Sequence, residues 1–383
     1  MRPLRVWLKA GHTVEIIRRM LPRFEDETGI AVDIAVVPES EAHDALAAGA
    51  ARPDVVTAPF WYLEELCEAG IVAPMALGDL GMNDASFVPL ALAALSRRNE
   101  LYAVPHTLTG GVLSYRADLF AGLGLDAPRT LSDVATAHFV LTDSDLPGLV
   151  ARCDRQFSSL ETYAGWAAAR GRTVLPDAGE ADADEVAAGI GDLVTMLAAR
   201  GAALTTLDYA AVGELVVSER ASMIFDTSAW VFRFEDDASP VRGRMGYAVI
   251  GDDHPAQFLY AEGLALTSWC TQPEAARRFL RWRHSDDVVR AEVEQIGRID
   301  VPRRDLRSRE WFDEHVRRRS LGDCLAAIDR SWESGDLRHV ARRADFVSRA
   351  REVMAAISGV IRGDHPSFAD AYGVSPAPTR PPA

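Results

Sequence analysis

Lysine is almost absent from this sequence. Lys9 is the only one among 383 residues, so 40 of the 41 lysine and arginine residues are arginine. A preference for arginine is typical of coding sequences rich in G and C, but it does not explain why one position kept an ammonium group. The stretch RVWLKAGHTVE, which contains Lys9, therefore raises the question of a specific role.

Positive charge and long apolar runs are also scarce. A net charge of −15 and an isoelectric point near 5.1 argue against nucleic-acid binding, which needs a clustered basic face. The one basic run, Arg317 to Arg319, is short and typical of a solvated helix end. No stretch approaches the roughly 20 apolar residues of a membrane span, so no direct membrane span is expected.

Cysteine is rare and scattered. Cys67, Cys153, Cys270 and Cys324 form no CxxC pair and no His-rich ligand spacing, so we expect buried free thiols, no metal and no cofactor. The sequence also lacks a GxGxxG motif, a Walker loop and a nucleophile elbow.

A secretory signal would need a basic end, an apolar stretch and a small-residue cleavage site before the first structural element. Here the first predicted strand begins almost at Met1. As written, the chain is expected to be cytoplasmic. If an export signal was removed and replaced by a start methionine, we expect an extracellular or periplasmic lipoprotein.

Strand and helix patterns alternate along the first 70 residues, which predicts an α/β fold with parallel strands. Strands are predicted over 3–8, 30–37, 54–57, 101–105, 112–115, 221–225, 244–249 and 263–267. Helices are predicted over 13–28, 40–51, 60–69, 117–123, 159–170, 183–200, 209–218, 273–284, 285–296 and 308–362. The length favours about two domains.

Five phrases of the chain, taken in order, resemble the family 1 extracellular solute-binding proteins that serve sugar importers. They are RVWLKAGHTVEIIRRMLPRFEDETGIAV, RPDVVTAPFWYLEELCEAGIVAPM, NELYAVPHTLTGGVLSYRADLFAGLGLDAPRTLSDV, VSERASMIFDTSAW and EGLALTSWCTQPEAARRFLRW. The resemblance covers nearly the whole chain. One departure is that Ala261-Glu262 replaces the glycine-tryptophan pair that often precedes the returning strand.

This resemblance implies a two-lobe type II periplasmic-binding-protein-like fold with a ligand cleft between the lobes. Lobe 1 is expected over 1–107 and 260–300, lobe 2 over 108–259 and 301–370, and a Pro-rich disordered tail over 371–383. The implied function is capture of a saccharide or similar small polar solute for the permease subunits of an ABC importer, with hinge motion near Pro105 and Tyr260.

Binding groups in open α/β sheets lie beyond the carboxyl ends of strands, which selects loop residues as the candidate site. Aromatic rings suit the C–H face of a sugar, carboxylates accept hydroxyl donors, and Lys or Arg supplies opposing donors. The candidate ligand-binding residues are Lys9, His12, Trp61, His106, Asp226, Ser228, Trp230, Tyr260, Glu262 and Arg298.

Several of these residues have a structural alternative. Trp61 and Trp230 can equally pack in a core. Asp226 can cap a helix that begins at Ser228, and Arg298 can simply pair with Asp300.

An enzyme is the alternative function. Lys9 beside His12 can act as a Schiff-base amine or an acid–base pair if burial lowers the pKa of the lysine. We therefore keep an intracellular enzyme recruited from this fold, which would use Lys9 and His12 or cleft carboxylates. A cytosolic ligand sensor is a third class.

Overall fold

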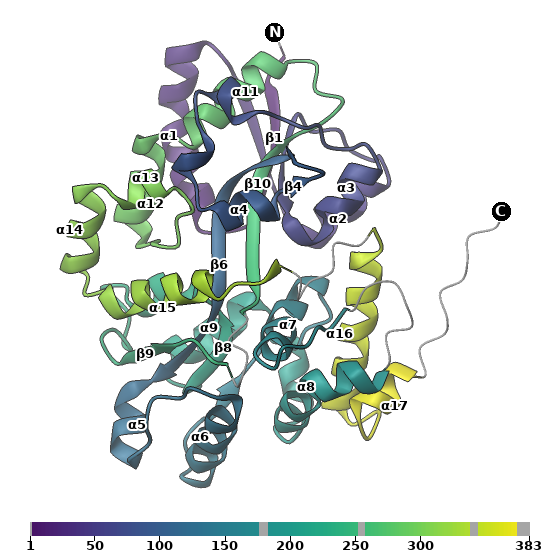
Figure 1. The fold of residues 1–383 in the computed structure, drawn as a ribbon, viewed down its shortest axis with the longest axis vertical. Helices are drawn as coiled ribbons and strands as arrows, with labels where there is room; N and C mark the ends of the chain where they lie inside the picture. Colours follow the sequence, from purple (N-terminus) through teal and green to yellow (C-terminus); the bar gives the residue numbers. More distant parts are fainter. Residues whose placement is uncertain (1, 176–182, 252–256, 338–343, 374–383) are drawn as a thin grey trace, which may run out of the picture.

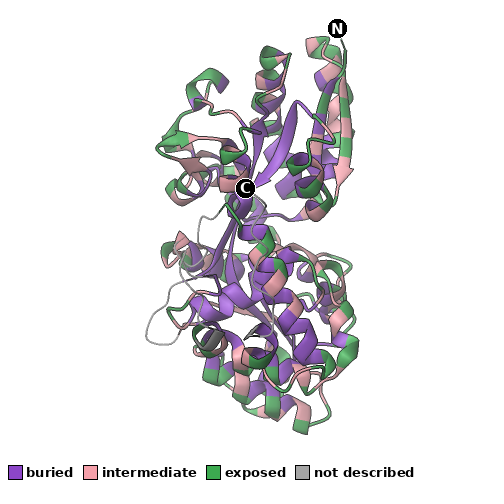
Figure 2. Cartoon of the chain, turned by 90° about the vertical axis from the view of Figure 1, so that its right-hand side faces the viewer, coloured by how far each residue is buried: buried purple, intermediate pink, exposed green. Residues whose placement is uncertain are grey.

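The computed structural model describes residues 2–175, 183–251, 257–337 and 344–373, which form two α/β lobes, one above the other in Figure 1. The upper lobe contains both β1 and the helices α1, α11 and α12, and the lower lobe contains α5, α6 and α8. Long strands run between the lobes, and the waist at this level is visible in Figure 2. This is the two-lobe arrangement predicted from the sequence.

Three parallel strands form the edge of the sheet in the upper lobe. The elements are β1 (Leu4–Lys9), α1 (Thr13–Thr28), β2 (Val32–Val37), α2 (Glu39–Ala47), β3 (Val55–Pro59), η1 (Phe60–Tyr62) and α3 (Leu63–Glu68). Helix α1 has the predicted bounds because Val14, Ile17 and Phe24 bury one face. It ends at Gly29, whose φ of 68° closes the helix in the left-handed conformation.

Two antiparallel strands, β6 (Ala103–Arg116) and β10 (Leu259–Leu266), connect the lobes. They belong to one sheet with the order β2-β1-β3-β10-β6-β8-β7, and β9 pairs with β6 off this path. β6 pairs with β10 from Ala103 to Gly110, and from Gly111 onward it pairs with β8 and β9. One strand therefore serves both lobes.

The prediction of two separate strands over 101–105 and 112–115 was wrong. The polar segment between them stays extended because its backbone is paired with β10. Gly110 and Gly111 do not form a turn. Because they lack side chains, Ser331 and Gln257 can pack closely against β6. A Cβ on Gly110 would lie 1.8 Å from Ser331 Oγ, and one on Gly111 would lie 2.8 Å from Gln257 Oε1.

The connection between β3 and β6 covers the upper lobe with short elements. They are η2 (Leu77–Leu80), η3 (Asp84–Ser86), α4 (Pro89–Ala94), β4 (Ser96–Arg97) and β5 (Glu100–Leu101). The lower lobe follows β6. Its elements are α5 (Ala117–Leu123), α6 (Leu131–Asp143), β7 (Leu149–Val150), η4 (Phe157–Ser159), α7 (Leu160–Ala168), α8 (Ala183–Ala198), η5 (Ala202–Thr206), α9 (Tyr209–Val217), β8 (Met223–Thr227), η6 (Ser228–Trp230), α10 (Val231–Phe234) and β9 (Met245–Ala248).

The chain returns to the upper lobe after β10 and ends in the lower lobe. The remaining helices are α11 (Pro273–Arg283), α12 (Asp286–Ile296), α13 (Arg304–Arg307), α14 (Glu310–Arg318), α15 (Gly322–Glu333), α16 (Phe346–Arg362) and α17 (Phe368–Gly373). The helical region predicted over 308–362 is divided, first at Ser320, whose φ is 56°. α13 and α14 contact η3 and α12, whereas α16 and α17 contact α8. The lobe boundary at 301 stays a prediction.

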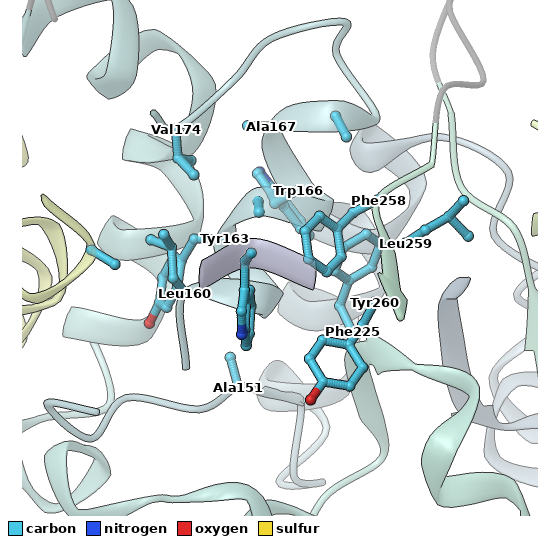
Figure 3. Packing of buried hydrophobic residues seen from close by; sticks show 14 of the residues in the cluster. Ala151, Leu160, Tyr163, Trp166, Ala167, Val174, Phe225, Phe258, Leu259 and Tyr260 are labelled. Atoms are coloured by element: carbon cyan, nitrogen blue, oxygen red, sulfur yellow. The ribbon is translucent and has the colours of Figure 1, made fainter. Parts of the chain in front are cut away.

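The main hydrophobic core extends through both lobes along the crossing strands. Figure 3 shows part of this core, which includes Trp166 of α7, Phe225 of β8, and Phe258, Leu259 and Tyr260 of the β10 region. The rings of Trp166 and Phe225 meet edge to face, with centroids 5.3 Å apart. Buried residues of both lobes therefore belong to one continuous core.

Helix α16 makes a further contact between the lobes, beside α2 and α3 (Figure 1). Arg351 pairs with Asp44 at 2.8 Å, and the backbone N–H of Val347 donates to Glu65 at 2.9 Å. We call this set of interactions the α16 contact.

Within the described ranges, no helix is long and apolar enough to cross a membrane. In the same part of the chain, no group of three or more metal-ligating side chains gathers. The four cysteines are free thiols. Of the predicted tail, residues 371–373 belong to α17, and 374–383 lie outside the described residues.

Candidate functional site

Lys9, the last residue of β1, lies among oxygen atoms supplied by β10 and α2. Its Nζ is 2.6 Å from Tyr260 Oη and 3.2 Å from Glu262 Oε2. It is also 3.1 Å from Glu39 Oε2, at the start of α2. The Tyr260 hydroxyl donates to Glu262 at 2.5 Å. We call Lys9, Glu39, Tyr260 and Glu262 the Lys9 cluster.

Electrostatics keep Lys9 and Glu262 ionised. Burial alone would lower the pKa of Lys9, but carboxylates raise it above its ordinary value. The carboxylates responsible, in order of effect, are Glu262, Glu39 and Glu161. Burial would raise the pKa of Glu262, yet Lys9 and its other neighbours lower it to about 2. At neutral pH, Lys9 is therefore an ammonium group beside the ionised carboxylate of Glu262.

His106, Thr107 and Arg298 extend the Lys9 cluster towards the hinge strands. His106 Nε2 is 3.9 Å from Glu262 Oε1, and burial lowers the pKa of His106 well below its ordinary value, so its ring is neutral. Arg298 donates to Thr107 Oγ1 at 2.8 Å and to the His106 carbonyl at 3.1 Å. It also pairs with Asp300 at 2.9 Å, the partner that the sequence allowed.

A second charged group lies in the lower lobe, around Arg152. Arg152 Nε donates to Asp226 at 2.8 Å, and Nη2 donates to Asp226 and, at 2.6 Å, to Glu161. Its guanidinium carbon lies 5.4 Å from the centre of the Tyr209 ring. The turn after β8 is capped by Thr227 rather than by Asp226. We call Arg152, Glu161 and Asp226 the Arg152 cluster.

The two clusters interact across the boundary between the lobes. Glu161 raises the pKa of Lys9, and Lys9 in turn lowers that of Glu161. Burial, together with the charge of Asp226, outweighs Lys9 and Arg152 and raises the pKa of Glu161 to about 7. Charged side chains of both lobes therefore converge where β6 and β10 cross.

The two predicted tryptophans lie in aromatic cores behind these clusters. Trp61 is 2% exposed; its ring stacks on Phe346 at 5.5 Å, and its Nε1 donates to Glu39 at 2.8 Å. Trp230 is 3% exposed and stacks on Tyr209 at 4.3 Å. The structure thus places both rings as supports for charged residues.

The other two predicted residues lie at contacts between elements. Ser228 is buried, and its Oγ accepts the backbone N–H of Gly110 at 3.4 Å, which joins η6 to β6. His12 is exposed and makes no capping hydrogen bond to α1. Its ring meets Phe232 of the lower lobe edge to face, with centroids 4.6 Å apart.

Sequence reasoning missed Glu39, Arg152, Glu161 and Tyr209. Glu39 follows the carboxyl end of β2, so the rule that selected Lys9 after β1 could also have selected it. Arg152 follows β7, a two-residue strand too short to give a periodic signal. Glu161 and Tyr209 lie in the first turns of helices, where polar residues are common and carry no specific signal.

Comparison with solved structures finds the same fold over the whole chain. A T. maritima protein described as maltose-bound MalE3 has a TM-score of 0.80 and 19% identity, with 97% of each chain covered. A solute-binding protein from Agrobacterium vitis S4 with bound D-mannitol has a TM-score of 0.80 and 17% identity, with 97% of this chain and 95% of the other covered. One from Thermotoga lettingae with alpha-D-tagatose has a TM-score of 0.81 and 17% identity, with 98% and 97% covered. The predicted periplasmic-binding fold is confirmed.

Comparison with protein families gives one match, from residue 10 to residue 288, to the bacterial extracellular solute-binding proteins. A search among curated individual proteins found no significant match. The family match contains both crossing strands and the whole Arg152 cluster. Since it spans most of the sequence, the chain belongs to family 1 of the bacterial extracellular solute-binding proteins.

Proposed function

We propose that this chain captures a polar, hydroxylated solute, a saccharide or a polyol, between its lobes and delivers it to the membrane subunits of an ABC importer. The observation that carries the proposal is the convergence of the Lys9 cluster and the Arg152 cluster from opposite lobes. The structural relatives described with maltose, mannitol and tagatose support the solute class.

The chemistry of the two clusters suits hydroxyl groups. Carboxylates accept hydroxyl donors, and charge-assisted hydrogen bonds are stronger than neutral ones. The Tyr260 ring is buried, with Lys9 Nζ 4.5 Å from its centre and Trp61 packed against it, so it positions the charged groups.

Because the two clusters belong to different lobes, a bridging solute contacts both of them only when the lobes are closed. Such a solute shifts the population towards the closed form in proportion to its differential affinity for the two forms. The importer then distinguishes the loaded protein from the empty one by the relative position of the lobes.

The catalytic alternative has less support. A Schiff-base lysine needs a lowered pKa so that the neutral amine is available. Here the neighbouring carboxylates raise the pKa of Lys9 and hold the ammonium form. His12, its predicted partner, contacts Phe232 instead.

Calorimetry and small-angle scattering with a panel of sugars and polyols test the proposal. We expect at least one solute to bind and to reduce the radius of gyration. Glu262→Gln is expected to weaken that binding by at least tenfold, which corresponds to about 1.4 kcal/mol. Glu314→Gln, an exposed carboxylate on α14, is the matched control and is expected to change nothing. Equally strong binding by both variants would show that the Lys9 cluster is not part of the solute-binding site.

A further inference from the structure

The carboxylates at the meeting point of the lobes outnumber the cations. The carboxylates are Glu39, Glu161, Asp226 and Glu262, and the cations are Lys9 and Arg152. Four negative and two positive groups leave a formal charge of −2 when all are ionised. The side chains of the four carboxylates are at most 12% exposed. Buried charge without a partner is costly, and burial together with Asp226 raises the pKa of Glu161 to about 7. Near neutral pH this carboxyl therefore either takes up a proton or is stabilised in its ionised form by an added cation.

The two cations of the clusters have no capacity left to neutralise more charge. An ammonium group has three donors, and those of Lys9 face Tyr260, Glu262 and Glu39. Arg298, the next cation towards the hinge, is already paired with Asp300. His106 is neutral because burial lowers its pKa.

Arg152 is likewise already paired with carboxylates. Its guanidinium donates to the carboxylates of Asp226 and Glu161, and its Nη1 donates to the Ser158 carbonyl at 3.0 Å.

Two carboxylate oxygens of the clusters, Glu39 Oε2 and Glu161 Oε1, are buried without a hydrogen-bond partner. Glu39 Oε2 lies 3.1 Å from Lys9 Nζ, so Glu161 Oε1 is the open position. Glu161 is 7% exposed, and its Oε2 accepts from Arg152. The charge of Glu161 raises the pKa values of Lys9 and Tyr260, so this carboxylate lies within electrostatic range of the Lys9 cluster. An ionised carboxylate oxygen only accepts hydrogen bonds, and a protonated amine only donates them.

We infer that the solute carries a positively charged amine, as an amino sugar or an aminated polyol does, and that Glu161 Oε1 receives this amine. The inference rests on the proposed function and narrows its solute class. The hydroxyl of Thr109 is also buried without a partner, and it lies directly across the strand pair from Tyr260. It offers a neutral contact for a hydroxyl group of the same solute.

Calorimetry with matched sugars tests this inference on the intact wild-type chain. The probes are glucosamine and galactosamine, each beside its parent sugar, which replaces the amine with a hydroxyl of similar size, and its N-acetyl derivative, which keeps the nitrogen but removes the charge and adds bulk. We expect the amine to bind at least tenfold more tightly than both uncharged partners. The comparison within each set needs no variant, so a folding defect cannot produce it.

Two variants locate the amine. Glu161→Gln is expected to reduce the ratio between the amino sugar and its parent by at least tenfold while binding of the parent persists. Glu314→Gln, exposed on α14, is expected to keep the ratio. An unchanged ratio in Glu161→Gln overturns the assignment to Glu161.

The amine preference and the proposed function can be refuted by different results. Tighter binding of the neutral sugars overturns the amine preference and leaves the proposed function standing. The absence of binding by every member of the panel, including neutral saccharides and polyols, counts against both.

Discussion

Replacing Lys9 with methionine tests whether the ammonium group holds the Lys9 cluster together. The change keeps most of the aliphatic stem but leaves Glu39 and Glu262, whose side chains are 7% and 12% exposed, without their cation. Removing one partner of a buried ion pair costs about 3–5 kcal/mol. The Lys9 side chain is 30% exposed, so solvent screens part of this, and we expect a loss near the lower end, about 3 kcal/mol.

This loss in the free energy of unfolding corresponds to a measurable decrease in the Tm. Unfolding entropy is about 2.1 cal/mol/K per residue, which gives roughly 0.8 kcal/mol/K for the chain. A loss of about 3 kcal/mol therefore lowers the Tm by about 4 °C in differential scanning calorimetry. Arg23→Met is the matched control. It removes exposed ion pairs with Glu27 on α1 and Asp287 on α12 and is expected to shift the Tm by less than about 1 °C.

Lys9→Arg separates charge from shape. It keeps the positive charge but replaces a compact ammonium with a planar fork, so we expect part of the lost stability to return. A Lys9→Met protein as stable as the Arg23→Met control would refute the account of Lys9 as the ion that organises these carboxylates.

The pKa of Glu262 is lowered to about 2 from an ordinary 4.5, so its stabilisation is present above pH 4.5 and is lost as the pH falls towards 2. The Tm difference between wild type and Glu262→Gln should therefore shrink over that interval, and a constant difference would contradict the ion pair. Burial of His43 is outweighed by its carboxylate partners, which raise its pKa above 6.5, so its stabilisation is present below pH 6.5 and is lost as the pH rises through the folded value. In His43→Gln, the Tm should fall less steeply with rising pH above 6.5 than in the wild type. An equal slope in both proteins would argue against stabilisation by protonated His43. A Cβ on Gly213 would lie 2.1 Å from the Trp230 ring, so Gly213→Ala should cost about 1–3 kcal/mol by chemical denaturation. Gly191→Ala, with nothing within 4 Å, should instead stabilise by about 0.5–1 kcal/mol; equal effects would show that Trp230 moves away freely.

Local patterns were enough to predict the alternation of strands and helices in the first 70 residues and the bounds of several helices, but they missed α4, α6 and β7. Helix α1 agrees residue for residue because its apolar spacing and its terminal glycine act locally. The observed bounds of strand β6 differ from the prediction, because the polar stretch from His106 to Thr109 stays extended only through its pairing with β10. That pairing joins residues about 150 positions apart, which no local pattern reports.

The candidate site shows the same limit. Position after a strand selected Lys9, and the structure brings it to Tyr260 and Glu262, two other predicted residues. Position alone could not decide whether Trp61 faces solvent, because that depends on Phe346 from the far end of the chain, which covers its ring. Which residues of the site bind solute stays a prediction.

The continuity of β6 determines the type of movement that is available. A continuous strand of 14 residues that belongs to both lobes has to bend along its length, whereas a flexible loop would let the lobes rotate freely. Opening the lobes must bend β6 and β10 elastically near Gly110, where Ser331 of α15 is in close contact, and must also break the α16 contact on another side. Any change in the angle between the lobes therefore has to deform a paired strand that both lobes share, so their movement is coupled to the integrity of the sheet.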